Sequence, residues 1–239
     1  MERKLPIKGF WPTSLIDWPR KLAAVIFVGG CNFRCAFCYN LELVLNPEKL
    51  PNLDEEEIIR KLKIRKNWLD GIVISGGEPT LHLGLEGFLR RIKELGFKVA
   101  LETNGTNPTV LATLIKARLI DGLFMDLKGP LEKYTEVVNT KIDQEKIKAS
   151  VALILKNRQI ESEFRTTVVP KFLNKKDIEW LGRKLFPQKC PVALVLQQFQ
   201  NQKTLDPSLK KISPYSEEQL KELQETALKY FQKVEIRGL

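Results

Sequence analysis

The chain of 239 residues contains no run that approaches the roughly 20 consecutive apolar residues of a membrane-spanning helix, so no contact with a membrane is expected. It also lacks the pattern of a secretory signal peptide, and we therefore expect a cytoplasmic protein whose thiols stay reduced. No linker, internal repeat or low-complexity stretch interrupts the sequence. A chain of this length suits one domain with a full-sized core, and we expect a single domain over residues 1–239.

Acidic residues are the minority among the charged side chains. The chain has 39 Lys and Arg against 29 Asp and Glu, a formal net charge of +10. A basic balance can indicate nucleic-acid binding, but these cations are dispersed, and most lie beside glutamates, as in residues 55–66 and 210–229. The pattern favours a solvated Lys/Glu-rich surface over a nucleic-acid interface. A basic face for an acidic protein or nucleotide partner is the alternative.

Cysteine is scarce, yet three of the four cysteines fall within eight residues, at Cys31, Cys35 and Cys38. Thiolates are soft ligands for zinc and for iron–sulfur clusters. A structural zinc site takes four ligands, and the remaining candidates, Cys190 and His82, lie far away in the sequence. A cubane cluster held by only three cysteines keeps one iron open for a substrate or cofactor. The spacing therefore favours a catalytic 4Fe–4S cluster without Cys190, with zinc or buried structural thiols as alternatives.

Apolar segments rich in β-formers alternate with helical patterns along most of the chain. The predicted strands cover residues 22–28, 71–75, 98–102, 122–127, 163–169 and 192–198. The predicted helices cover residues 39–44, 54–68, 83–95, 108–117, 144–156, 175–186 and 216–231. This alternation predicts a parallel sheet with helices outside it. Six units are too few for a complete eight-fold barrel, so we expect an α/β fold with an open partial (β/α)6 TIM-like barrel.

Within this single domain we expect three parts: a core over about residues 20–200, an N-terminal extension over 1–19, and a C-terminal helix with a short strand over 213–239. In such barrels the chemistry lies at the carboxyl ends of the strands. The cysteine loop directly follows the first predicted strand, which is where a catalytic site is expected.

Polar segments end the next four predicted strands. They contribute, in order, Gly76, Gly77 and Glu78, then Thr103 and Asn104, then Asp126 and Lys128, then Arg165. Glycines at a strand end allow the backbone to approach a ligand closely, and a carboxylate can accept a hydrogen bond from an ammonium group. Ordinary turn chemistry accounts equally well for each segment taken alone.

Taken together, these segments resemble the radical S-adenosylmethionine (SAM) superfamily. The Cx3CxΦC loop, with the aromatic Phe37 before its third cysteine, follows an apolar strand and Gly29-Gly30, and Gly-Gly-Glu-Pro comes about 40 residues later. The resemblance implies a radical SAM core with two cofactors, a 4Fe–4S cluster on Cys31, Cys35 and Cys38 and SAM on its open iron. It implies reductive cleavage of SAM to a 5′-deoxyadenosyl radical.

The resemblance also assigns the SAM pocket, although no side chain is implied as a nucleophile or general base. Glu78 and its glycines would hold the amino group of SAM, and Thr103 and Asn104 would line its ribose and carboxylate. Asp126 and Lys128 would position SAM, and acidic strand ends can surround a monovalent cation. The full implied set is Phe37, Gly76, Gly77, Glu78, Thr103, Asn104, Asp126, Lys128 and Arg165.

Further stretches are similar to one group within the superfamily, the anaerobic ribonucleotide reductase activating proteins. They are Thr13-Ser14-Leu15-Ile16-Asp17-Trp18-Pro19, Leu196-Gln197-Gln198-Phe199 and Thr204-Leu205-Asp206-Pro207. The implied function is that of a glycyl-radical-enzyme activase, an oxidoreductase. Its partners would be a glycyl radical enzyme, the anaerobic ribonucleotide reductase, and an electron donor such as flavodoxin or ferredoxin. The alternative is a radical SAM enzyme acting on a small molecule, like 7-carboxy-7-deazaguanine synthase.

Two residues depart from the pattern of these families. Tyr39 follows the last cysteine where the activating proteins commonly have histidine, and Gln200 stands where pyruvate formate-lyase activase has a histidine near SAM. Neither change removes a cluster ligand. The segments at 10–12 and 18–19 contain the aromatic residues Phe10, Trp11 and Trp18. These are explained either by a docking surface for the partner or by packing against the first strand.

Overall fold

The computed structural model describes residues 4–186 and 188–239 and divides into two compact units. The first unit comprises Met1–Asn32, Glu42–Phe124 and Gln159–Glu161, and the second comprises Phe33–Leu41, Met125–Arg158 and Ser162–Leu239. The first three residues of the predicted N-terminal extension, and one residue of the Pro-rich loop at 187–191, lie outside the described residues. The single domain over residues 1–239 stays a prediction.

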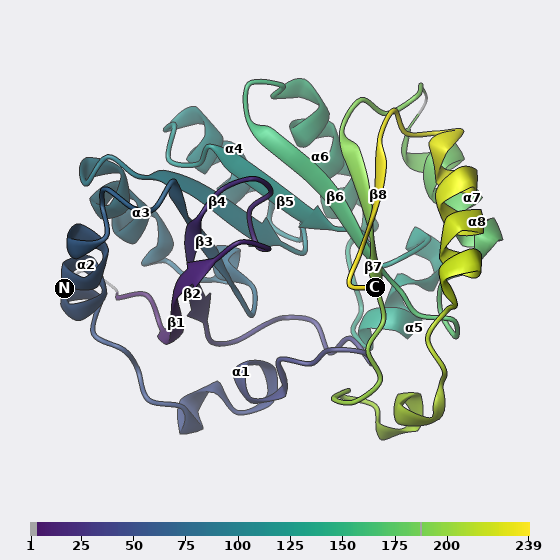
Figure 1. The fold of residues 1–239 in the computed structure, drawn as a ribbon, viewed down its shortest axis with the longest axis horizontal. Helices are drawn as coiled ribbons and strands as arrows, with labels where there is room; N and C mark the ends of the chain where they lie inside the picture. The colour runs from purple at the N-terminus through teal and green to yellow at the C-terminus, as the bar shows by residue number, and fades with distance from the viewer. Residues whose placement is uncertain (1–3, 187) are drawn as a thin grey trace. The chain divides into compact units, whose positions relative to one another are not determined.

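The strands of the first unit follow one another in the sheet in chain order (Figure 1). They are β1 (Ile7–Ser14), β2 (Ala23–Val28), β3 (Gly71–Gly76), β4 (Lys98–Thr103) and β5 (Gly122–Asp126), whose last two residues belong to the second unit. β2, β3 and β4 are parallel. The helices are α1 (Leu41–Leu45), α2 (Glu55–Ile64), α3 (Leu85–Glu94) and α4 (Pro108–Lys116), with short 3-10 turns at Pro47–Lys49 and Pro79–Leu81. Each predicted strand and helix in this part is confirmed, with ends that differ by a few residues.

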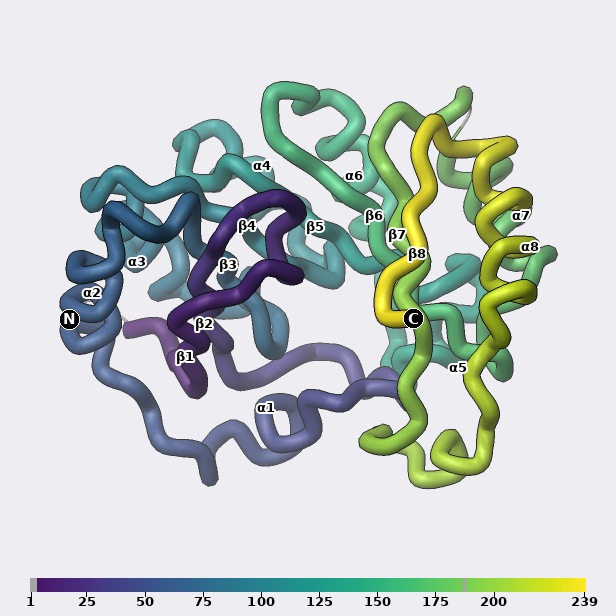
Figure 2. Tube along the Cα trace, viewed as in Figure 1, coloured from purple at the N-terminus to yellow at the C-terminus, as the bar shows by residue number. Residues whose placement is uncertain are grey.

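Strand β1 was not predicted. It runs antiparallel to β2, and Figure 2 shows the chain turning back along that strand. Its register shifts twice, between Ile7 and Gly9 and between Trp11 and Ser14, and Pro12 lies in the second shift. Proline is tolerated on an edge strand because it has no N–H to donate. The interrupted pairing and the exposed residues 11–13 hide the alternation that would identify a strand from the sequence.

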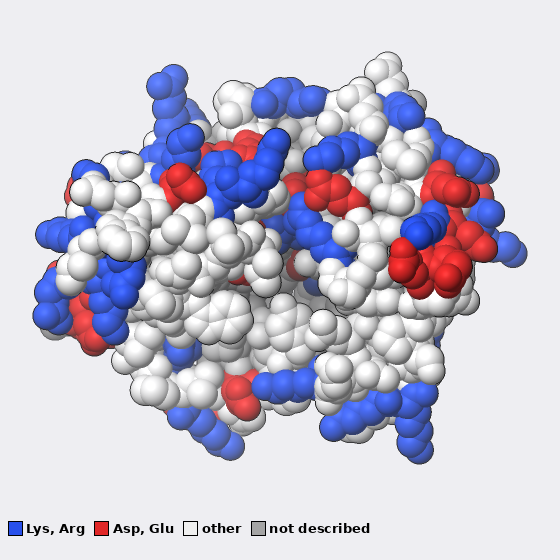
Figure 3. Space-filling view, viewed as in Figure 1, with Lys and Arg blue, Asp and Glu red and all other residues white. Residues whose placement is uncertain are grey.

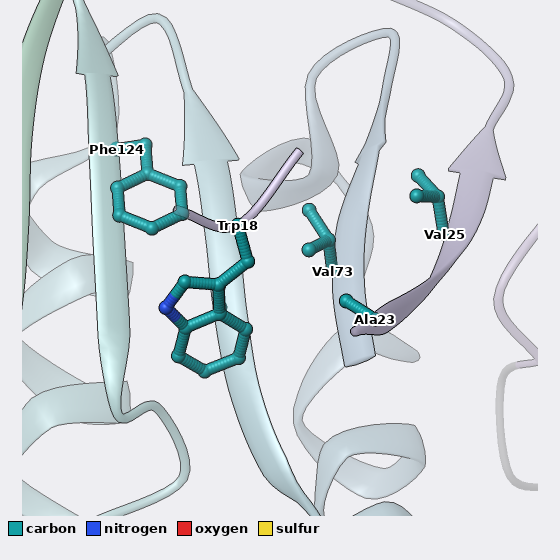
Figure 4. Close-up of a cluster of buried hydrophobic side chains, with 6 residues drawn as sticks. Trp18, Ala23, Val25, Val73 and Phe124 are labelled. Carbon is teal, nitrogen blue, oxygen red and sulfur yellow. The ribbon is translucent and has the colours of Figure 1, made fainter. Parts of the chain in front are cut away.

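One face of the first unit's sheet carries a cluster of side chains around a tryptophan (Figure 4). Trp18 is fully buried among residues from successive strands, namely Ala23, Val25, Val73, Ala100 and Phe124. A Cβ at Gly71 would lie only 2.6 Å from the indole ring, and one at Gly122 only 3.2 Å, so both glycines make room for it. The indole N–H donates to Glu161 at 3.1 Å.

For Trp18, this burial confirms packing in the core over exposure at a docking surface. Trp18 packs in the core, whereas Trp11 is 56% exposed and meets Phe27 edge to face. Leu15 and Ile16 are also exposed, on a turn that Ser14 closes by hydrogen bonds with Asp17.

The second unit contains the parallel strands β6 (Glu161–Val168), β7 (Ala193–Gln198) and β8 (Val234–Arg237), again in chain order. Its helices are α5 (Tyr134–Val138), α6 (Gln144–Lys156), α7 (Lys175–Leu185) and α8 (Glu217–Leu228), with 3-10 turns at Leu131–Lys133 and Pro207–Lys211. Capping boxes at Asn174 and Ser216 set the starts of α7 and α8. Only the short helix α5 and the 3-10 turns were not predicted.

The charged side chains are dispersed over the surface, as the sequence predicts. Lys and Arg side chains are spread over the face drawn in Figure 3, with Asp and Glu among them. Across the described residues, no helix combines the length and the apolar character needed to cross a membrane.

The burial of Trp18 predicts a large loss of stability on truncation. Trp18→Ala should lower the free energy of unfolding by about 4 kcal/mol, because it removes a large core side chain between two glycines that cannot fill the space. Chemical denaturation measures this. Trp68→Ala is the matched control, since Trp68 is 78% exposed and its loss should change stability by less than about 0.5 kcal/mol. Equal losses in the two variants would contradict this core assignment.

Candidate functional site

The turn that leads into the cysteine loop lies in the first unit, directly after β2. Gly30 has a φ of +87°, which favours glycine. Its N–H donates to Leu43 O at 2.7 Å, and its carbonyl accepts from the N–H of Glu78 at 2.8 Å. The segment before Cys31 is therefore bonded to the Gly-Gly-Glu segment that ends β3.

The two glycines before Glu78 are required by this close approach of two chain segments. A Cβ at Gly77 would lie 1.8 Å from Gly30 O. Gly76 has a φ of +109°, and its Cβ would lie 2.6 Å from the backbone of Val28. Any side chain at Gly77 would push these segments apart. The sequence predicts that these glycines allow the backbone to approach a ligand, whereas in the structure they make room for the contact between two chain segments.

Glu78 is a buried carboxylate, 1% exposed, that accepts four hydrogen bonds from neutral donors. Oε1 accepts from Thr80 N at 3.1 Å, Thr80 Oγ1 at 2.6 Å and Thr103 Oγ1 at 2.8 Å. Oε2 accepts from the backbone N–H of Asn104 at 2.6 Å. These donors come from the segments that follow β3 and β4, so the carboxylate joins two strand ends.

The electrostatics of Glu78 favour a cationic ligand. Burial raises the pKa of its carboxyl, and the hydrogen bonds from Asn104, Thr80 and Thr103 oppose that rise only in part. No Lys, Arg or His in the described parts of the chain forms an ion pair with it. A buried carboxylate without a counter-ion is costly. An ammonium group would offset that cost.

Thr103 and Asn104 are also buried, and the side chain of Asn104 reaches the cysteine loop. Its Nδ2 lies 2.8 Å from Asn32 Oδ1 and 4.0 Å from the sulfur of Cys31. The first unit therefore brings together Cys31 and the predicted residues Gly76, Gly77, Glu78, Thr103 and Asn104.

The other two cysteines of the loop belong to the second unit. Cys38 N–H donates to Cys35 O at 2.9 Å, which closes a turn between the two thiols. The loop backbone is held by the end of α5, since Arg34 N donates to Val138 O at 2.8 Å and Ala36 N to Val137 O at 3.2 Å. Burial raises the pKa of the Cys38 thiol, and the Asn40 N–H and Lys128 oppose this.

Lys128 and Asp126 form an ion pair beside this turn. The ammonium lies 2.8 Å from Asp126 Oδ2 and 5.5 Å from the centre of the Phe37 ring. Burial alone would lower the pKa of Lys128, but the charges of Asp126 and Cys35 outweigh it and hold the pKa above its ordinary value. The backbone N–H of Lys128 donates to the hydroxyl of Tyr134 at 3.0 Å. Three of the predicted residues, Phe37, Asp126 and Lys128, therefore lie together with Cys35 and Cys38.

Arg165 on β6 is buried, and it has a protein counter-ion. Its Nε donates to Glu163 at 3.0 Å, and Arg237 on β8 holds the same carboxylate with two nitrogens at 2.6 and 2.9 Å. The family resemblance implies a place for Arg165 in the SAM pocket, where the carboxylate of SAM would offset the burial of its charge. In the structure Glu163 already offsets it.

The donor set of the loop suits an iron–sulfur cluster by its chemistry. None of the four cysteines forms a disulfide, and three soft donors lie in one short loop. Within residues 4–186 and 188–239, no group of three or more His, Cys, Asp or Glu side chains is close enough to hold a metal ion. The assignment therefore rests on ligand type and spacing. Cys190 is 1% exposed and bonds to Val192 O, and burial raises its pKa to about 11, as for a structural thiol.

Comparison with known sequences identifies the family. The model of the radical SAM superfamily matches residues 25–184, and the chain belongs to this superfamily. It is 38% identical, over 99% of its own length and 97% of the relative's, to a protein of Methanocaldococcus jannaschii that bears the provisional name of a glycyl-radical enzyme activating enzyme. The chain is therefore a radical SAM enzyme, a family that implies a 4Fe–4S cluster and SAM.

Solved structures confirm the fold class. SuiB of Streptococcus suis, solved with S-adenosylmethionine bound, matches with a TM-score of 0.65 and 17% identity over 87% of this chain and 48% of SuiB. QueE of Escherichia coli matches with a TM-score of 0.58 and 15% identity over 99% of this chain and 95% of QueE. Similarity at these identities concerns the fold, which is the open partial α/β barrel of the radical SAM core.

Several contacts of the site were not predicted from the sequence. Tyr134 is fully buried beneath Lys128, but the segment around it shows no motif. Glu163 and Arg237 lie 74 residues apart, and only the pairing of β6, β7 and β8 brings them together. No role was predicted for Asn32, although an amide between two cysteines could have suggested contacts with the loop.

The raised pKa of Glu78 predicts a specific dependence of stability on pH. In the folded protein without SAM, Glu78 holds its proton more tightly than in the unfolded chain. Stability therefore falls as the pH rises from the ordinary glutamate value through the raised pKa, by at most about 1.4 kcal/mol per pH unit. Glu78→Gln removes this titration. The unfolding free energy of wild type minus that of the variant should fall with pH, whereas a constant difference would place the pKa at its ordinary value.

Proposed function

We propose that this chain is a glycyl-radical-enzyme activase, which cleaves SAM reductively to a 5′-deoxyadenosyl radical and installs a glycyl radical on a partner enzyme. The observation that carries the proposal is the 38% identity to the M. jannaschii protein over nearly the whole of both chains. The proposed partner is an anaerobic ribonucleotide reductase, because the chain resembles that group of activating proteins at 13–19, 196–199 and 204–207. A flavodoxin or ferredoxin is the proposed electron donor.

In this proposal Cys31, Cys35 and Cys38 ligate a 4Fe–4S cluster whose fourth iron is open to SAM. When bound, the cluster and SAM supply a one-electron cleavage of the sulfonium bond. Glu78 receives the amino group of SAM, which is the cationic partner that this buried carboxylate otherwise lacks. The role of the protein is to position the cofactors and exclude water.

The remaining pocket residues are proposed to position SAM. They are Phe37, Gly76, Gly77, Thr103, Asn104, Asp126, Lys128 and Arg165. The ion pair with Glu163 fixes the guanidinium of Arg165 before any ligand arrives. A monovalent cation beside Asp126 is also proposed, and it would share a carboxylate that Lys128 already holds at 2.8 Å.

The proposed pocket predicts that two variants lose affinity for SAM but keep the cluster. Glu78→Ala and Arg165→Ala should each weaken SAM binding about tenfold or more, since each removes a charge-assisted hydrogen bond, while the absorbance of the cluster stays unchanged. Anaerobic equilibrium dialysis with reconstituted protein measures the affinity. Glu86→Ala is the control, because Glu86 pairs with Arg90 on the exposed face of α3. Unchanged affinity in both pocket variants would contradict the assignment of the pocket.

The activase role predicts a radical on another protein. The reconstituted chain, incubated anaerobically with SAM, reduced flavodoxin and an anaerobic ribonucleotide reductase, should give the electron paramagnetic resonance doublet of a glycyl radical. We expect about one radical per activated partner and only slow SAM cleavage without it. Cys31→Ala should abolish the signal, whereas Cys190→Ala should retain both iron and signal. Rapid multiple turnover of a nucleotide-like small molecule without a protein partner would instead support the deazaguanine synthase-like alternative.

A further inference from the structure

A closed ring of polar contacts lies beside Cys31 and joins the side chains of Asn32, Asn104 and Thr106. Asn104 Oδ1 accepts from the backbone N–H of Thr106 at 3.0 Å and from its hydroxyl at 2.7 Å. Asn104 Nδ2 donates to Asn32 Oδ1 at 2.8 Å, and Asn32 Nδ2 donates to Thr106 Oγ1 at 2.9 Å. Cys31 and the three residues of the ring all belong to the first unit.

The backbone fixes the direction of every hydrogen bond in this ring. The N–H of Thr106 can only donate, so the atom of Asn104 that faces it must be the oxygen. The amide nitrogen of Asn104 then points the other way, toward Asn32. The oxygen of Asn32 receives that bond, and its nitrogen is left to donate to the hydroxyl of Thr106. The usual ambiguity of amide orientation is thereby removed.

The ring leaves one amide proton of Asn104 for the sulfur of Cys31. Nδ2 carries two protons, and one is used by Asn32. The sulfur of Cys31 lies 4.0 Å from the same nitrogen, at the long end of the range for a sulfur acceptor. Asn104 is only 5% exposed, so water competes little for that proton.

We propose that Asn104 is a positioning residue for the cluster, because its side-chain amide donates to the Cys31 sulfur and thereby raises the reduction potential. This rests on the proposed function, in which Cys31 is a cluster ligand. Reduction adds negative charge to a cluster and its thiolates, and a donor to a ligand sulfur stabilises that charge. Hydrogen bonds to the sulfurs are one of the factors that set such potentials.

The same residue joins the cluster ligand to the carboxylate that is proposed to bind SAM. The backbone N–H of Asn104 donates to Glu78 Oε2 at 2.6 Å, while its side chain faces Cys31. A displacement of Glu78 would therefore move the donor to the sulfur. Occupation of Glu78 by an ammonium group and the potential of the cluster are coupled through one residue.

The test is the midpoint potential of the reconstituted cluster, measured by anaerobic redox titration, in wild type and in Asn104→Leu. Leucine has a similar shape but no donor, so the potential should shift to a more negative value. The Fe–S(Cys) stretching bands in the resonance Raman spectrum should shift too. Asn107→Leu is the matched control, because Asn107 donates to the backbone oxygen of Thr80 and not toward a sulfur. It should leave both readouts unchanged.

A second variant keeps the proposal open to contradiction if Asn104→Leu fails to fold or to load iron. Thr106→Val keeps the backbone donor to Asn104 but removes the hydroxyl that donates to Asn104 and accepts from Asn32. The amide of Asn104 is then held less firmly, and the variant should give a smaller shift in the same direction. If neither variant that loads iron shifts the potential, or if Asn107→Leu shifts it equally, the role of Asn104 is wrong. Failure of the proposed function can be told apart from failure of this inference. If Cys31 is not a cluster ligand, Cys31→Ala will retain a full complement of iron.

Discussion

The buried carboxylate of Glu78 is the constraint on which the first unit's site depends. It accepts hydrogen bonds from residues 80, 103 and 104, and its own N–H bonds to the carbonyl of Gly30, one residue before Cys31. Three loops at the carboxyl ends of parallel strands are thereby fixed to one another. Neutral donors satisfy its hydrogen-bonding capacity but not its charge. A cationic ligand would compensate that charge, which is the role proposed for the amino group of SAM.

The glycines around Glu78 show why this arrangement tolerates little change. Gly77 lies so close to the carbonyl of Gly30 that a Cβ would clash with it. Gly76 has a positive φ, and a Cβ there would clash with the backbone of β2. The conformational freedom of glycine here serves contact between two loops. Because the same loops carry Cys31 and Glu78, their packing also fixes where the Cys31 thiol lies relative to that carboxylate.

Much of the fold could be predicted from the sequence, because β2, β3, β5 and β7 each contain a run of apolar residues and α6, α7 and α8 begin at clear capping residues. β1 could not be predicted, because its pairing is broken at Pro12 and its residues 11–13 are exposed. The candidate ligands followed from spacing and resemblance. Contacts between distant segments did not, and the pairing of Glu163 with Arg237 is the clearest case. Such contacts depend on tertiary geometry that no local pattern encodes.

The central claim is a cluster with three protein ligands and one iron that is open to SAM. Mössbauer spectroscopy of the protein reconstituted with ⁵⁷Fe tests it most directly, in the presence and absence of SAM. The account predicts about four irons per chain, one of which changes its isomer shift when SAM is added while the others stay constant. A spectrum that SAM leaves unchanged, or a purified chain that contains one zinc in place of the cluster, would contradict it.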